Sequence, residues 1–121
     1  MKEDLLDLNF LYQLAKNDEG YVNEVVRLYL ANVPEGLKKL EKAISETNDF
    51  ELIQRLAHAI KPSANIIRVL GMYDALVQIE AMARERSDKI LMLSLVEKIA
   101  ANFEKALPLI LAEKLKPQLV G

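Results

Sequence analysis

The spacing of apolar residues constrains the fold of this chain more strongly than any other feature of its sequence. Between Asp49 and Gly71, apolar side chains recur every three or four residues, as on one face of an α-helix. The members of this face are Ile53, Leu56, Ala57, Ile60, Ala64 and Ile67. Similar spacing runs through most of the chain, and no Asn-Gly or Asp-Gly pair joins alternating segments as in a β-hairpin. The sequence therefore predicts an all-α fold.

Helix start and stop signals divide the chain into segments expected to be helical, namely residues 5–17, 19–31, 34–48, 49–71, 72–86 and 91–107. Asp49 is a suitable N-cap, Gly71 should end the fourth segment, and Pro108 should kink or end the last. The inward residues should include Leu5, Leu8, Leu11, Tyr12 and Leu14 in the first segment, and Leu91, Leu95, Ile99, Phe103 and Leu107 in the last. Four longer helices with short connections predict an antiparallel up-down four-helix bundle, with additional short N-terminal helices across one end.

Length and composition exclude several classes of protein. The 121 residues suffice for one domain, expected to span residues 1–121, and are too few for two. Because the chain has no cysteine, it cannot form disulfides or cysteine-based zinc or iron–sulfur sites. Its 16 basic and 18 acidic residues give a net charge of -2, which provides no long-range attraction to nucleic acid. The acidic N-terminus is unlike a secretory signal, and no apolar run is long enough for a membrane span. A cytoplasmic protein that binds neither nucleic acid nor membrane is expected.

The side of the 49–71 segment opposite the apolar face carries a continuous polar stripe, which consists of Gln54, His58, Lys61, Asn65 and Arg68. His58 is the only histidine in the chain, and the stripe contains two cations and no acid. An unprotonated imidazole nitrogen can attack phosphorus, and a lysine one turn away can offset phosphoryl charge. The stripe therefore suits an anion. A buried core histidine does not fit this phase, whereas an idle surface histidine remains an alternative. A metal site is disfavoured, because no second histidine or carboxylate cluster accompanies His58.

A proline follows the histidine by four residues. Pro62 lacks the N–H that would bond the carbonyl of His58, so it costs stability beside the candidate nucleophile. It predicts a bend next to His58. One interpretation is a simple kink that curves the helix around the core, and the other is a compact residue that lets a partner reach the imidazole.

These residues together resemble the histidine-containing phosphotransfer (HPt) domain of two-component phosphorelays. The centre of that family reads Ala-His-x-hydrophobic-Lys-Gly, and residues 57–62 read Ala-His-Ala-Ile-Lys-Pro. The similarity extends over nearly the whole chain through Asn17-Asp18-Glu19, Tyr29, Pro34 with Leu37 and Leu40, and Asn48-Asp49. The chain departs from the family at the two positions where glycine is usual, because it has Pro62 and Arg68 there.

The resemblance implies a role for each residue of the site. His58 would accept a phosphoryl group from a receiver-domain aspartate, or from a kinase, and pass it to another receiver. Lys61 would lie beside the phosphoryl group. Glu80, which follows His58 by 22 positions, would bond the imidazole and set its tautomer, unless it is a plain solvated glutamate. The candidates for contact with the partner are Gln54, Pro62, Ser63, Asn65 and Arg68.

Expectations for nucleotide, cofactor and partners follow from the residues and from the resemblance together. It contains no glycine-rich nucleotide loop, so it should neither bind ATP nor phosphorylate itself, and it is expected to be a carrier rather than an enzyme. It should hold no cofactor, because the divalent cation would belong to the receiver. A monomer is expected. The alternative function is a non-phosphorylatable helical module that binds receivers without phosphotransfer. A metal-binding or small-ligand four-helix bundle ranks last, because Glu80 is the only inward polar candidate.

Overall fold

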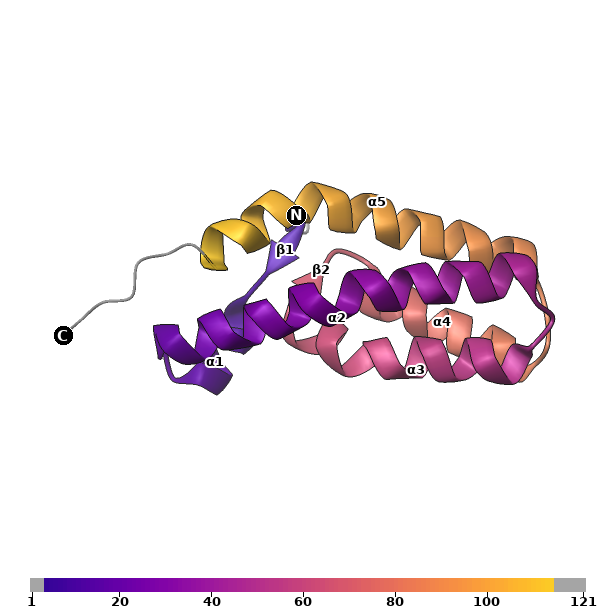
Figure 1. Ribbon diagram of the computed structural model, residues 1–121, viewed down its shortest axis with the longest axis horizontal. Helices are drawn as coiled ribbons and strands as arrows, with labels where there is room; N and C mark the ends of the chain where they lie inside the picture. The colour runs from indigo at the N-terminus through magenta and orange to yellow at the C-terminus, as the bar shows by residue number, and fades with distance from the viewer. Residues whose placement is uncertain (1–3, 115–121) are drawn as a thin grey trace.

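The computed structural model describes residues 4–114, which form a bundle of helices with a minimal strand pair (Figure 1). The elements in chain order are β1 (Leu6–Asp7), α1 (Asn9–Ala15), α2 (Glu19–Glu46), α3 (Phe50–Ile66), β2 (Arg68–Val69), α4 (Met72–Arg84) and α5 (Lys89–Lys114). The helices α2 to α5 lie side by side along the long axis, and α1 and the strands occupy one end. This arrangement confirms the predicted all-α bundle. Residues 1–3 and 115–121 of the expected 1–121 domain lie outside the described residues.

The core lies where the apolar faces of the four long helices meet. The pairs α3–α4, α2–α5 and α2–α3 make the most extensive contacts. Fully buried large side chains come from every helix, including Leu11, Leu40, Ile53, Ile79 and Ile99. Removal of each such side chain from water contributes about 1.5–3 kcal/mol, and packing of this face therefore holds the helices together more than helix propensity does.

Local polar groups define where the helices begin. Asp49 accepts a hydrogen bond from the backbone N–H of Leu52 at 3.0 Å, which confirms it as the N-cap of α3. Asp18 caps α2 in the same way through the N–H of Tyr21. At the far end of the bundle, Lys89 Nζ donates to the carbonyl of Thr47 at 2.6 Å and so joins the α2–α3 loop to the start of α5.

The segments 19–31 and 34–48 form one helix, α2, instead of the two that were predicted. Pro34 lies inside this helix and costs it a single backbone hydrogen bond. On both sides of Pro34 the buried residues Tyr29, Val33 and Leu37 follow one apolar face. Burial of this continuous face outweighs the lost bond, and the helix therefore continues through the proline.

The boundaries of the first and fourth segments were wrong, because a strand pair replaces helix there. Leu6 and Asp7 pair in antiparallel register with Val69 and Arg68, so α1 begins only at Asn9 and α3 ends at Ile66. Gly71, expected to end the fourth helix, instead has φ 76° immediately before α4, a left-handed conformation that glycine adopts without strain. This pair joins two segments that are more than 60 residues apart in sequence, so no local sequence pattern predicts it.

The inward face of α5 also differs from the prediction. Ile99 and Phe103 are buried as expected, but Leu91 is 44% exposed and Met92 is buried in its place. Apolar residues surround the start of this helix, so their spacing does not define its inward face. Leu14, expected to face inward in the first segment, is similarly 46% exposed. Pro108 does not end α5, which continues to Lys114.

Candidate functional site

Three side chains from two neighbouring helices form a connected polar cluster. His58 Nδ1 lies 3.0 Å from Glu80 Oε1, and Lys61 Nζ donates to Glu80 Oε2 at 2.8 Å. His58 and Lys61 are three residues apart on α3, so they lie on consecutive turns of one face. Glu80 is on α4, which packs closely along α3. The structure thus brings together the three residues predicted to form the site.

Glu80 is the only charged side chain among the buried residues that the structure describes, at 7% exposure. A buried carboxylate requires hydrogen bonds and an opposite charge. Lys61 and His58 provide these, one on each carboxylate oxygen. The alternative of a plain solvated glutamate is therefore wrong.

Electrostatics favour the ionised form of Glu80. The hydrogen bond from Lys61 is the largest effect on the pKa of Glu80; it lowers this pKa against the opposing effect of burial, and the hydrogen bond with His58 lowers it further. An ionised carboxylate can only accept hydrogen bonds. In the neutral imidazole, the proton must therefore reside on Nδ1 of His58, which leaves Nε2 with its lone pair.

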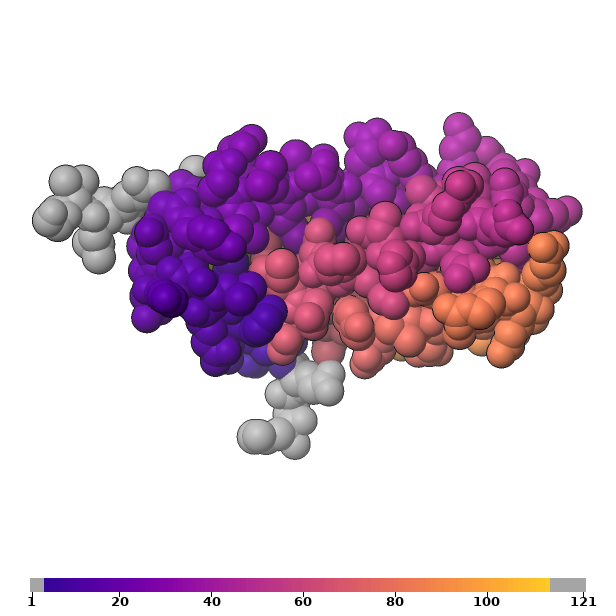
Figure 2. All heavy atoms as spheres, turned by 90° about the horizontal axis from the view of Figure 1, so that it is seen from below, coloured from indigo at the N-terminus to yellow at the C-terminus, as the bar shows by residue number. Residues whose placement is uncertain are grey.

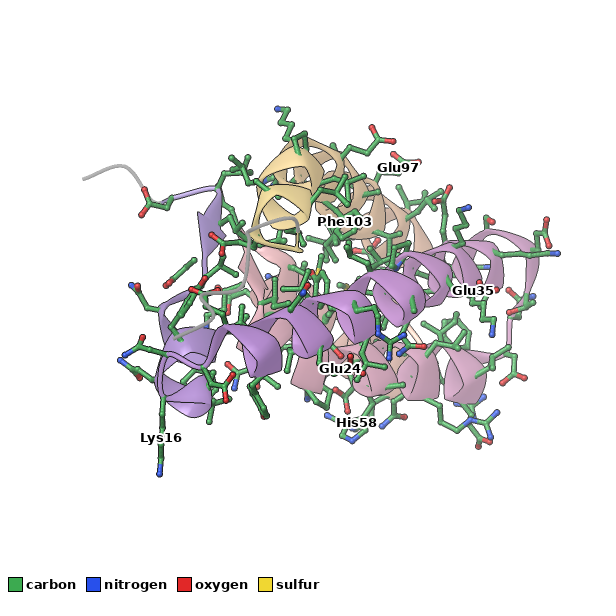
Figure 3. All side chains as sticks on the ribbon, turned by 60° about the vertical axis from the view of Figure 1, so that its left-hand side comes forward. Lys16, Glu24, Glu35, His58, Glu97 and Phe103 are labelled. Carbon is green, nitrogen blue, oxygen red and sulfur yellow. The ribbon has the colours of Figure 1, made fainter. Side chains whose placement is uncertain are left out.

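The imidazole projects from the outer surface of the bundle. Figure 3 shows His58 pointing away from α3, and its side chain is 67% exposed. Its neighbours Ala57 and Ile60 are buried, so the predicted phase of this helix is correct. The ring is consequently fixed at Nδ1 by a buried group and open to a partner at its other edge.

A second cation approaches the same carboxylate and was missed by the sequence interpretation. Arg84 Nη2 lies 3.7 Å from Glu80 Oε1, and the Arg84 side chain is 62% exposed. Arg84 follows Glu80 by four residues on α4, and this helical spacing is the signal that could have identified it once Glu80 was assigned to the site.

Pro62 does not interrupt the helix that carries the site. α3 runs without a break from Phe50 to Ile66, with Pro62 exposed inside it. The bend that this proline predicts beside His58 stays a prediction. The exposed position of the ring agrees with a compact residue on the outer surface one turn from His58.

The remaining members of the predicted stripe separate into helical residues and Arg68. Gln54 and Ser63 are half-buried on α3, and Asn65 is exposed there. Arg68 lies in β2, so its assignment to the helical stripe was wrong, because α3 ends before it. Its guanidinium lies 4.9 Å from the centre of the Phe10 ring, and its Nε donates to the carbonyl of Asn65 at 2.8 Å. Arg68 therefore fastens α1 to the end of α3.

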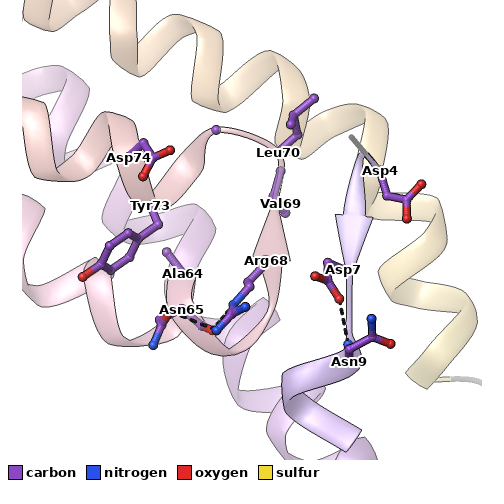
Figure 4. A pocket seen from close by; sticks show the side chains of 11 residues that line it. Asp4, Asp7, Asn9, Ala64, Asn65, Arg68, Val69, Leu70, Tyr73 and Asp74 are labelled. Carbon is purple, nitrogen blue, oxygen red and sulfur yellow. Dashed lines mark hydrogen bonds between the residues drawn. The ribbon is translucent and has the colours of Figure 1, made fainter. Parts of the chain in front are cut away.

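Two surface hollows lie beside the C-terminal part of α3, beyond Pro62. An open cleft of about 540 Å³ lies at the end of α3 and is lined in part by Asn65, Arg68 and Tyr73 (Figure 4). A shallow apolar hollow of about 120 Å³ lies between α2 and α3, with Leu28 and Ser63 in its lining. The space-filling view in Figure 2 shows the surfaces of α2, α3 and α4 side by side on this part of the molecule.

Residues 4–114 offer neither a metal-binding cluster nor a membrane-spanning helix. No group of three or more histidine, aspartate or glutamate side chains in this range has an arrangement that could hold a metal ion. No described helix combines the length and the apolar character needed to cross a membrane.

Comparison with known families agrees with this geometry. The Hpt domain family matches residues 24–115, a range that contains α2 to α5 almost completely and includes His58, Lys61 and Glu80. The strand β1 and the helix α1 precede the matched range. No curated protein and no solved structure matches the chain. Hpt domains are phosphocarriers of phosphorelays that interact with receiver domains, and they have no ATP site of their own. Because the match extends over most of the chain, this protein belongs to the Hpt domain family.

Proposed function

We propose that this chain carries a phosphoryl group on Nε2 of His58, which it accepts from a receiver-domain aspartate or a kinase and passes to another receiver. The arrangement of the imidazole is the observation that carries this proposal. Nδ1 lies 3.0 Å from a buried carboxylate, while the side chain is 67% exposed. A histidine with this arrangement has a defined tautomer and an accessible lone pair, which are the two requirements for a nucleophile.

These side chains define how the phosphoryl group would be transferred. The lone pair of Nε2 attacks phosphorus in line, the bond between phosphorus and the aspartyl oxygen breaks, and the carboxylate leaves with the electron pair. The product ring is positively charged, with its proton still on Nδ1 and facing Glu80. A carboxylate in this position stabilises the developing imidazolium, as an orienting acid does in a catalytic triad. Lys61 offsets negative charge near the ring, and the receiver supplies the divalent cation.

The step is reversible by the same geometry. Loss of the phosphoryl group to a second receiver regenerates the neutral imidazole, with its Nδ1 proton unchanged. The chain therefore needs neither nucleotide nor metal ion of its own, and we propose that it acts as a carrier rather than an enzyme.

The surface around His58 supports docking of a receiver. Half-buried or exposed apolar side chains of α2 and α3, including Leu28 and Ile66, line a hollow together with the polar residue Ser63. Such a mixed surface suits a transient complex, whose interface can be small. Gln54 and Pro62 extend this surface along α3, and Arg68 adjoins it through its hydrogen bonds with Asn65.

Phosphotransfer from a radiolabelled receiver tests the proposal. Purified receivers phosphorylated on aspartate are mixed with the wild-type chain and with His58→Gln, and label on the chain is followed with time. We expect acid-labile label on the wild type and none on the variant. Full labelling of His58→Gln would refute the assignment. Binding of receivers without any labelling would instead support the non-phosphorylatable module.

A further inference from the structure

The two cations beside Glu80 are held with very different strength. Lys61 is 22% exposed and donates to Oε2 at 2.8 Å, and its hydrogen bond is the largest effect on the pKa of this carboxyl. Arg84 lies 3.7 Å from Oε1, beyond hydrogen-bond distance, and is 62% exposed. Lys61 is thus hydrogen-bonded to the carboxylate, whereas Arg84 makes only a longer ionic contact with it.

The position of Arg84 relative to the imidazole is the second observation. Arg84 Nη2 and His58 Nδ1 both lie against the same oxygen, Glu80 Oε1. The guanidinium is therefore beside the ring that would carry the phosphoryl group. Its planar array of N–H donors matches phosphoryl oxygens better than an ammonium does, and the side chain that carries them is 62% exposed.

We propose that Arg84 is the side chain that contacts the phosphoryl group on His58, whereas Lys61 acts on it mainly as a positioning residue through Glu80. This inference rests on the proposed function. On phosphorylation the guanidinium would leave its weak contact with Oε1 for the phosphoryl oxygens, and Lys61 would keep Glu80 and the imidazole in place. The two cations would thus have separate tasks.

Charge balance supports this division. Glu80, Lys61 and Arg84 together carry one net positive charge beside a neutral imidazole. Transfer of the phosphoryl group adds one net negative charge, because the dianionic group is attached to a ring that becomes positive. With Arg84 the phosphorylated site is neutral, and without Arg84 it carries a net negative charge. Removal of this cation should therefore destabilise phosphohistidine specifically.

The experiment compares Arg84→Gln with Arg86→Gln. Arg86 is similarly exposed, at 68%, but lies 4.0 Å from Glu51 rather than beside the site, so its substitution removes the same charge elsewhere. The chains are phosphorylated with phosphoramidate, a small donor that needs no docking surface. The equilibrium yield of phosphohistidine is then measured for each chain.

We expect Arg84→Gln to lower the equilibrium yield of phosphohistidine about fivefold, from the Coulomb energy of one exposed charge at short range. Arg86→Gln should match the wild type, and Arg84→Lys should recover part of the loss. Equal yields for Arg84→Gln and the wild type would overturn the inference, and so would equal losses in the two arginine variants. Either result would leave the phosphocarrier function intact, provided that the wild type is labelled on His58.

A second measurement tests the role of Lys61. Nitrogen-15 shifts of the His58 ring report the Nδ1–H tautomer, independently of phosphorylation. Lys61→Gln should reduce the preference for this tautomer, whereas Arg84→Gln should leave it unchanged. If Arg84→Gln alters the tautomer as much as Lys61→Gln does, the two cations share one task and the proposal fails. If the wild type takes no label on His58, the inference fails together with the function.

Discussion

Substitution of Glu80 by glutamine should reveal how much the buried carboxylate contributes to folding. Glutamine keeps the size of the side chain but has a single acceptor oxygen. It cannot accept from both His58 and Lys61, whose donors lie 3.0 and 2.8 Å from the two oxygens of Glu80. Hydrogen bonds to a charged group contribute about 1.5–3 kcal/mol and neutral ones about 0.5–1.5 kcal/mol. The imidazole is 67% exposed, so water weakens the contribution of its hydrogen bond with Glu80 to stability.

Glu80→Gln should therefore lower the free energy of unfolding by about 1.5 kcal/mol at neutral pH, an order of magnitude in the folding equilibrium. The difference should depend on pH in a defined direction. Lys61, and to a lesser extent His58, hold the pKa of Glu80 below its ordinary value. The carboxylate consequently contributes stability above the unfolded-state pKa of about 4.3, and this contribution is lost as pH falls through the lower folded-state pKa.

Urea unfolding followed by far-ultraviolet circular dichroism checks both points between neutral pH and about pH 3.5. Glu97→Gln is the matched control, because Glu97 is exposed on α5. The difference in the free energy of unfolding between the wild type and Glu80→Gln should narrow as pH falls below the ordinary carboxyl pKa of about 4.3. A difference that is constant throughout, or a variant as stable as the wild type at pH 7, would refute the reasoning.

Four other substitutions test three separate features of the fold. Pro62→Ala restores a backbone donor inside α3 and should raise the urea midpoint by an amount equivalent to about 1–2 kcal/mol; an unchanged midpoint would show that the helix already accommodates the proline. Arg68→Gln removes the cation above Phe10 and should cost about 0.5–1 kcal/mol in thermal unfolding, with no loss if the contact is weak in water. Ile99→Ala should lower the free energy of unfolding by about 2–5 kcal/mol, and Leu91→Ala should lower it by under about 1 kcal/mol. A larger loss for Leu91→Ala than for Ile99→Ala would show that the inward face of α5 has been assigned incorrectly.

Much of the candidate site could be predicted because its parts are local. His58 and Lys61 share a face through the helical repeat alone, and Asp49 caps their helix with its own side chain. The resemblance to the Hpt family added Glu80, at a spacing that the helix period does not explain. Its burial and its two hydrogen bonds arise only because α3 and α4 pack together.

The incorrect predictions have a common cause. Pro34 was expected to begin a helix, because a proline is unfavourable in a helix interior, yet burial of the face around it has the larger effect. The fourth segment was extended to Gly71, because nothing near Arg68 reveals its pairing with Asp7. In each case an interaction between distant residues overrode a correct local preference.

The sequence by itself therefore determined the helical class, most helix faces, the Asp49 cap and the pair of His58 and Lys61, because these depend on neighbours within one or two turns. The tertiary structure alone decided the extent of α2, the strand pair, the inward face of α5 and the approach of Glu80 to His58 and Lys61. The physical reason is that free energies of burial and charge pairing are set by which surfaces meet. The helical period predicts which residues share one face of a helix, but it does not predict which other helix or strand that face will pack against.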